Sequence, residues 1–173
     1  MNKMLALVFG ALTSLSASAN DAKPLMVEQS VVINASADNV WTQIRNFNDL
    51  GAWHPAVKST AITSGENNKI GAMRLLTLQD GGTIQEKLLR YDAGKKSFTY
   101  SITEGVLPVS GYVSSVAVIP EDASHSKVVW RGDFKRKDLS ETPASGQDDE
   151  TATNTISAVY RAGLDNLKKI ADQ

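Results

Sequence analysis

The chain has 173 residues, of which 42% are hydrophobic and 21% are charged, and its formal net charge is −1. These values are typical of one globular domain that is large enough for a hydrophobic core. The net charge gives no positive electrostatic potential that would indicate binding of nucleic acid. The sequence contains no cysteine, which excludes disulfides, a thiol nucleophile and thiolate metal ligands.

The first 19 residues have the pattern of a secretory signal peptide. Lys3 supplies a short positive region, an apolar run covers residues 5–15, and small residues at Ala17 and Ala19 form a cleavage site. The apolar run is well short of the ~20 residues that span a bilayer, so an uncleaved anchor is the weaker alternative. We expect cleavage after Ala19, no stable membrane insertion afterwards, and a periplasmic or secreted protein.

Residues 26–171 predict a single domain that begins with a strand and two short helices. Residues 27–33 alternate as a strand does, and Ser36 is a suitable N-cap for a helix that runs to about Asn46. A second short helix is expected before Pro55, because proline ends a helix.

The remainder of the domain predicts strands followed by one long helix. Period-two patterns indicate strands over residues 57–63, 73–79, 83–91, 97–103, 112–119 and 127–135. Residues 149–171 then place apolar side chains on one helical stripe, with acidic residues at the start and lysines near the end. Antiparallel hairpins with segregated helices indicate the α+β class.

Glu86 is the most informative polar residue of the predicted sheet. Alternation across a two-residue turn near Gly81 places Glu86 on the inward face and Arg74 on the wetter, opposite face. The inward set in this reading is Met73, Leu75, Thr77, Ile84, Glu86 and Leu88. A buried carboxylate is costly without a partner, so Glu86 is expected either in a buried salt bridge that fixes packing or facing a ligand.

Aromatic residues gather on the same inward side. Alternation places Tyr100 and Trp130 inward, where they form either plain core or the wall of a binding site. Gly163 lies on the inner stripe of the last helix beside Tyr160. A glycine there costs about 1 kcal/mol of helix stability, so it either allows close packing or leaves empty volume above the sheet.

The segment that contains Trp53 and His54 can rim the mouth of such a cavity, and Tyr112 can add a hydroxyl. His54 is expected to be structural or solvated, with proton transfer as the alternative. His54 and His125 are the two histidines of the sequence, and this pair is too sparse and in the wrong sequence context for a zinc site. No metal site is therefore predicted, and no motif assembles a catalytic set.

A family resemblance rests on the order and spacing of many short segments. These are residues 31–36 with Val40 and Trp41, 47–50, 53–57, Gly71 with Arg74, 86–89 with 91–92, Tyr100 with Ile102, 107–109 with Tyr112, and 129–130 with Phe134. Together they resemble the helix-grip fold of the START/Bet v 1-like superfamily. More closely, they resemble the bacterial polyketide cyclase/dehydrase-type (SRPBCC) proteins.

The resemblance implies a curved antiparallel sheet of about seven strands around the long C-terminal helix. It also implies a deep, mostly apolar cavity between them that takes a hydrophobic or amphipathic small molecule without a cofactor. We expect Arg74 and His54 near its rim, and Glu86 with a tyrosine at the ligand's polar end. The predicted ligand-binding residues are Trp53, His54, Arg74, Glu86, Tyr100, Tyr112, Trp130, Tyr160 and Gly163.

Two other functions stay open at this point. The first is a cyclase- or dehydratase-like enzyme, with Glu86 as acid or base and a tyrosine as oxyanion donor. The second is an accessory protein that modulates a periplasmic dehydrogenase by contact. It is suggested because the exported subgroup is similar to the periplasmic accessory protein of bacterial methanol oxidation. Genes that neighbour this one would discriminate that role.

Overall fold

The computed structural model describes residues 22–173, so the predicted signal peptide and its cleavage after Ala19 lie outside the described residues. The elements are β1 (Leu25–Ile33), α1 (Ala37–Ile44), the 3-10 turn η1 (Leu50–Ala52), β2 (Val57–Ser64), β3 (Met73–Leu78), β4 (Thr83–Asp92), β5 (Ser97–Gly105), β6 (Val109–Pro120), β7 (Ser126–Arg136) and α2 (Asp149–Ala171). The α+β class and the predicted element order are confirmed, with strand ends that differ by a few residues.

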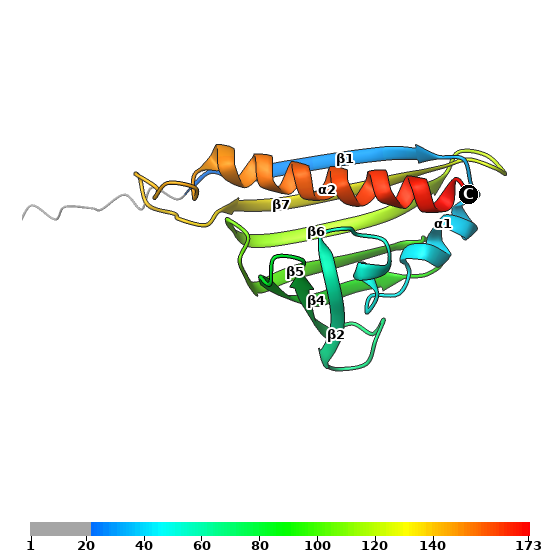
Figure 1. Ribbon diagram of the computed structural model, residues 1–173, viewed down its shortest axis with the longest axis horizontal. Helices are drawn as coiled ribbons and strands as arrows, with labels where there is room; N and C mark the ends of the chain where they lie inside the picture. The colour runs from blue at the N-terminus through cyan, green and yellow to red at the C-terminus, as the bar shows by residue number, and fades with distance from the viewer. Residues whose placement is uncertain (1–21) are drawn as a thin grey trace, which may run out of the picture.

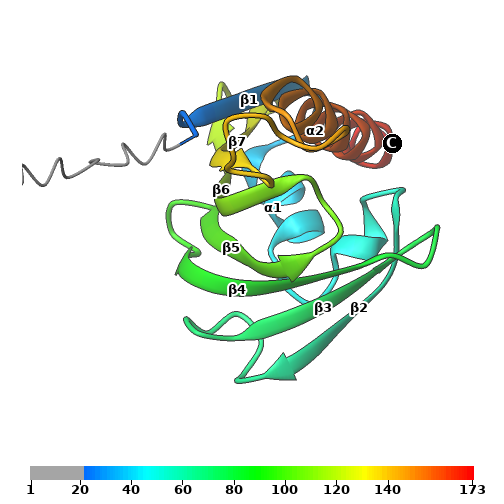
Figure 2. The same ribbon diagram turned by 90° about the vertical axis from the view of Figure 1, so that its left-hand side faces the viewer.

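The seven strands form one antiparallel sheet in the order β1-β7-β6-β5-β4-β3-β2. The long helix α2 packs along β1 and β7, as Figure 1 shows. The sheet curves strongly, and α1 and η1 lie on its concave side (Figure 2). The hydrophobic core therefore sits between the concave face of the sheet, the two short helical segments and α2.

The bounds of α2 are those that the sequence predicts. The side chain of Asp148 caps the helix by accepting a hydrogen bond from the Thr151 backbone N–H at 2.7 Å. At the other end, Lys168 Nζ donates to the Val32 carbonyl at 2.8 Å, which ties the last turn of α2 to β1. The buried residues are Ala152, Ile156, Tyr160, Gly163, Leu164 and Leu167, which form one stripe against the sheet.

The two short helices differ from each other in regularity. Ser36 caps α1 as predicted, and its hydroxyl accepts from the Asn39 backbone N–H at 3.3 Å. The second is a single turn of three residues, and the N–H groups of Trp53 and His54 both bond to the Leu50 carbonyl. A glycine within the turn and a proline shortly after it leave no room for a longer helix.

The faces predicted for β3 are wrong. Arg74 pairs with Glu86, and the Leu78 N–H bonds to the Gly82 carbonyl, so three residues rather than two form the turn. Gly81 takes a φ of +89°, the left-handed position of a three-residue hairpin turn. One extra residue reverses which β3 side chains share a face with those of β4. Arg74 and Leu76 therefore point into the core, whereas Met73, Leu75 and Thr77 point away from it.

Candidate functional site

A cavity of about 70 Å³ lies inside the fold, walled by the sheet, the segment that follows α1, and α2. Its lining residues are Leu50, His54, Ala56, Val57, Leu76, Leu78, Ile84, Glu86, Tyr100, Ile102, Leu107, Tyr112, Trp130 and Val159. Ala56 is exposed and Leu78, Leu107 and Val159 are half-buried, so these residues mark the side of the cavity that faces solvent. The wall is apolar apart from a few polar side chains, whose partners decide what the cavity can bind.

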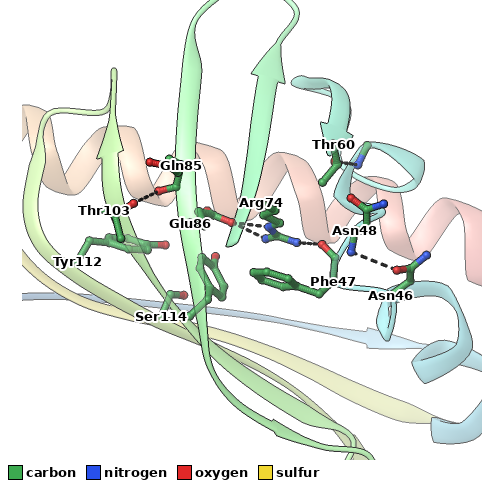
Figure 3. A network of polar contacts seen from close by, with 12 residues as sticks. Asn46, Phe47, Asn48, Thr60, Arg74, Gln85, Glu86, Thr103, Tyr112 and Ser114 are labelled. Carbon is green, nitrogen blue, oxygen red and sulfur yellow. Dashed lines mark hydrogen bonds and ion pairs between the residues drawn. The ribbon is translucent and has the colours of Figure 1, made fainter. Parts of the chain in front are cut away.

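Arg74 and Glu86 form a buried ion pair across β3 and β4. Arg74 Nε donates to Glu86 Oε2 at 2.6 Å, and the NH2 group lies 2.6 Å from the same oxygen. Both side chains are at most 5% exposed, and the pair is drawn in Figure 3. Burial raises the pKa of Glu86, and the positive charge of Arg74 opposes that rise. Glu86 thus faces inward as predicted and has the salt-bridge partner that its burial requires.

Arg74 also connects the sheet to the loop between α1 and η1. Its NH1 group donates to the Phe47 carbonyl at 2.5 Å, and its guanidinium lies 4.0 Å from the centre of the Phe47 ring. The Phe47 N–H in turn donates to Asn68 Oδ1 at 2.9 Å. The guanidinium is thus held by a carboxylate, a carbonyl and a ring. The expectation that Arg74 lies near the rim is wrong, because its exposed fraction is 2%.

A chain of hydroxyl groups joins α2 to the middle of the sheet. The hydroxyl oxygens of Tyr112 and Tyr160 lie 2.5 Å apart, and Tyr160 is 2.9 Å from Ser114 Oγ. Trp130 Nε1 donates both to Ser114 Oγ at 3.0 Å and to the Tyr100 hydroxyl at 3.1 Å. The rings of Trp130 and Tyr160 are stacked with centroids 4.5 Å apart. These contacts fix the aromatic wall of the cavity in one arrangement.

Burial raises the pKa of every tyrosine in this chain of hydroxyls. Burial and the nearby Glu86 charge raise the pKa of Tyr100 to about 12. The pKa of Tyr112 is raised well above its ordinary value by burial and by the neighbouring Tyr100 and Tyr160. Burial likewise raises the pKa of Tyr160. All three hydroxyls are therefore neutral at physiological pH and can donate hydrogen bonds.

His54 is locked by hydrogen bonds at both ring nitrogens. Nδ1 accepts from the Ala56 N–H at 3.2 Å, so the proton resides on Nε2, which donates to the Val159 carbonyl at 3.0 Å. Burial lowers the pKa of His54, which keeps the ring neutral. The exposed fraction is 2%, so the expected rim position is wrong, although the ring does line the cavity.

Gly163 allows the helix to approach this histidine. A Cβ atom at Gly163 would lie 2.6 Å from His54 Cδ2 and 2.8 Å from Trp130 Cζ3. Of the two alternatives left by the sequence, close packing is the one observed. Trp53 packs behind this contact, its ring centroid 5.4 Å from that of Trp130, while its carbonyl accepts from Asn166 Nδ2.

The structure brings the predicted site residues together in two layers. His54, Glu86, Tyr100, Tyr112 and Trp130 line the cavity directly. Trp53, Arg74, Tyr160 and Gly163 are not in its wall, but each contacts a residue that is. Any contact of either layer with a ligand stays a prediction.

Sequence reasoning missed most of the apolar wall. These residues are Leu50, Ala56, Val57, Leu76, Leu78, Ile84, Ile102, Leu107 and Val159. Strand alternation places Ile84 inward, and with the correct turn length it would also place Leu76 inward. Ala56 and Leu107 lie in connections between elements, where no periodic signal exists.

Within residues 22–173, no group of three or more histidine, aspartate or glutamate side chains is arranged to hold a metal ion. No helix of this part of the chain is long and apolar enough to cross a membrane.

A seven-stranded antiparallel sheet curved around a long C-terminal helix, with a cavity between them, defines a helix-grip protein. Residues 24–172 match the family described as "Polyketide cyclase / dehydrase and lipid transport", and the chain belongs to this family. The predicted SRPBCC, polyketide cyclase-type resemblance is thereby confirmed.

Similar structures come from several bacteria. XoxI from Bacillus cereus has a TM-score of 0.73 and 31% identity, covering 84% of this chain and 94% of its own. A protein from Bacillus thuringiensis has a TM-score of 0.75 and 31% identity, and the match covers 86% of this chain and 100% of that protein. The aromatase/cyclase Zhui from Streptomyces has a TM-score of 0.69 with 18% identity, covering 87% and 94%, and shows the fold alone.

A plant protein is also similar in sequence. "MLP-like protein 423" from Arabidopsis thaliana is 25% identical over 114 residues, which cover 61% of this chain and 73% of that protein.

Proposed function

We propose that this chain is a binding protein for a hydrophobic or amphipathic small molecule, held in the cavity between the sheet and α2. The observation that carries the proposal is the cavity wall, which is apolar over most of its residues and opens through the apolar side chains Leu78, Leu107 and Val159. Ligand sites are generally concave, mostly apolar and provided with a few polar groups that fix orientation. Membership of a family described by cyclases and lipid transport supports the same class of ligand.

The volume of the cavity limits the size of what it holds without rearrangement. About 70 Å³ is half of the ~150 Å³ of an engineered apolar cavity that binds benzene, and far below the ~300–1,000 Å³ of drug-sized sites. The deep cavity implied by the family resemblance is therefore small here, because Trp130, Tyr112 and neighbouring aromatic residues fill the interior. A larger ligand has to displace side chains or leave part of its apolar body in the opening.

Native mass spectrometry of the protein purified from its own host tests the proposal. Two variants on adjacent residues of α2 make a matched pair: Val159→Phe fills the opening, whereas Ala158→Phe adds the same ring at an exposed position. We expect the unsubstituted chain and Ala158→Phe to carry a bound small molecule, and Val159→Phe to lack it. A mass without adduct for the unsubstituted chain, with another protein co-purifying, would favour the accessory role instead.

Export is proposed from the leader pattern of the first 19 residues. The same spectrum tests it, because a chain that begins at Asn20 has lost the mass of residues 1–19. A chain from the host that still begins at Met1 would contradict export by cleavage.

A further inference from the structure

The two oxygens of the Glu86 carboxylate have different surroundings. Oε2 takes both contacts from Arg74, and Oε1 accepts no hydrogen bond from any of residues 22–173. Within residues 22–173, Asn48 Oδ1 is the one side-chain oxygen or nitrogen that is sealed from solvent and has no hydrogen-bond partner. Oε1 has no hydrogen-bond partner among these residues and is not sealed from solvent, and Glu86 lines the cavity. The cavity is therefore the route by which a ligand reaches Oε1.

Most other polar atoms of the wall are already committed to protein partners. His54 uses both ring nitrogens, Trp130 Nε1 donates to two oxygens, and the Tyr112 hydroxyl is bonded to that of Tyr160. The Tyr100 hydroxyl differs, because it accepts from Trp130 and no hydrogen bond within residues 22–173 uses its own proton, although the Ser114 and Tyr112 hydroxyls lie nearby. The cavity thus presents one acceptor, Glu86 Oε1, and one donor, the Tyr100 O–H, on the neighbouring strands β4 and β5.

We infer that the cavity selects an apolar molecule that carries a hydroxyl group, an alcohol or a phenol, which donates to Glu86 Oε1 and accepts from the Tyr100 hydroxyl. This inference rests on the proposed function and names the class of ligand for the same site. A hydroxyl satisfies both wall groups because it is donor and acceptor at once. A ketone of the same shape satisfies only Tyr100 and sets its oxygen against the carboxylate, which desolvates that charge without compensation.

A pair of probes with one carbon skeleton tests the inference on the intact protein. Binding of 2-hexanol and of 2-hexanone is measured at pH 8 by NMR chemical-shift titration. Each probe is larger than the cavity, so its polar end enters the cavity and the rest of its carbon chain lies in the opening. We expect 2-hexanol to bind at least about tenfold more tightly, the ratio for one hydrogen bond to a charged group. Equal affinities would overturn the inference and leave the proposed function standing. If neither probe binds, the inference and the proposed function are both overturned.

Glu86→Gln gives a sharper test, because it replaces the hydrogen-bond acceptor in the cavity wall with a donor. A guanidinium only donates, so the amide oxygen turns toward Arg74 and the NH2 group faces the cavity as a donor. With two donors in the wall, 2-hexanone becomes the preferred probe. Glu104→Gln makes the same chemical change at an exposed position of β5 and should keep the preference for 2-hexanol. An unchanged preference in Glu86→Gln would contradict the assignment. If Glu86→Gln does not fold, the ratio of the affinities of the unsubstituted protein for 2-hexanol and 2-hexanone decides whether the inference holds.

Discussion

Gly163 of α2 lies against the ring of His54, so close that a Cβ atom would sit 2.6 Å from His54 Cδ2. The same imidazole donates to the Val159 carbonyl one turn earlier in the helix. The missing side chain therefore sets how near α2 lies to the segment that carries His54, and this approach keeps the cavity small.

Gly163→Ala should destabilise the protein although alanine is the better helix former. Helix propensity alone would favour alanine by about 1 kcal/mol, but the added methyl meets two rigid rings, and overpacking costs about 1–3 kcal/mol. Urea unfolding measures the difference. Ala158→Gly, on the exposed face of α2, gives the helix-propensity effect alone. An increase in stability for Gly163→Ala would contradict the close contact.

Removing either partner of the Arg74–Glu86 pair should cost far more than removing both. A single change such as Arg74→Met leaves a buried, unpaired charge, which costs about 3–5 kcal/mol. The double variant, which combines Arg74→Met with Glu86→Gln, leaves no isolated charge and should lie close to the unsubstituted protein. Chemical denaturation of the unsubstituted protein, the two single variants and the double variant gives the coupling energy. Additive effects would contradict a buried pair.

The stability of the protein should fall steeply above about pH 10. The pKa of Tyr100 is raised to about 12, and those of Tyr112 and Tyr160 are also raised by burial. The folded state then holds protons that the unfolded chain releases near pH 10, so stability declines by up to about 1.4 kcal/mol per pH unit for each tyrosine. Phenolate absorbance at 295 nm should rise together with the loss of near-ultraviolet circular dichroism. If the phenolate absorbance of these three tyrosines rose near pH 10 while the protein was still folded, their burial would be contradicted.

Below about pH 6.5 the protein should lose stability through His54. Its pKa is lowered by burial, so the unfolded chain binds a proton that the folded one does not, and stability decreases as the pH falls below the ordinary value of ~6.5. His54→Gln should flatten the dependence of unfolding free energy on pH between 7 and 5. An NMR titration of the His54 ring should give a midpoint below 6.5, and a midpoint above that value would contradict the neutral, doubly bonded ring.

The helix α2 was fully predictable because its signals are local. Its stripe, its acidic start at Asp149 and its lysines near the end all depend on spacing within one segment. The inward position of Glu86 is predictable because the residues of β4 alternate between the two faces of the sheet. The face of its partner Arg74 is not predictable in the same way, because the relative faces of two strands depend on the length of the turn between them, and one extra residue reverses them.

The cavity itself was less accessible to sequence reasoning. The sequence indicates aromatic residues on the concave face, yet whether they enclose space depends on how their rings pack. The stacking of Tyr160 on Trp130 and the approach of His54 to Gly163 are relations between distant segments, and no pattern within one segment predicts them.

The central claim is that the interior cavity binds an apolar molecule, and intermolecular nuclear Overhauser effects test it most directly. With 2-hexanol as probe, we predict contacts between its methyl protons and the methyl groups of Ile84, Ile102 and Leu107, which line the cavity. Contacts confined to exposed methyl groups such as those of Val113 and Ile119 would contradict the claim, since these lie on the outer face of the sheet.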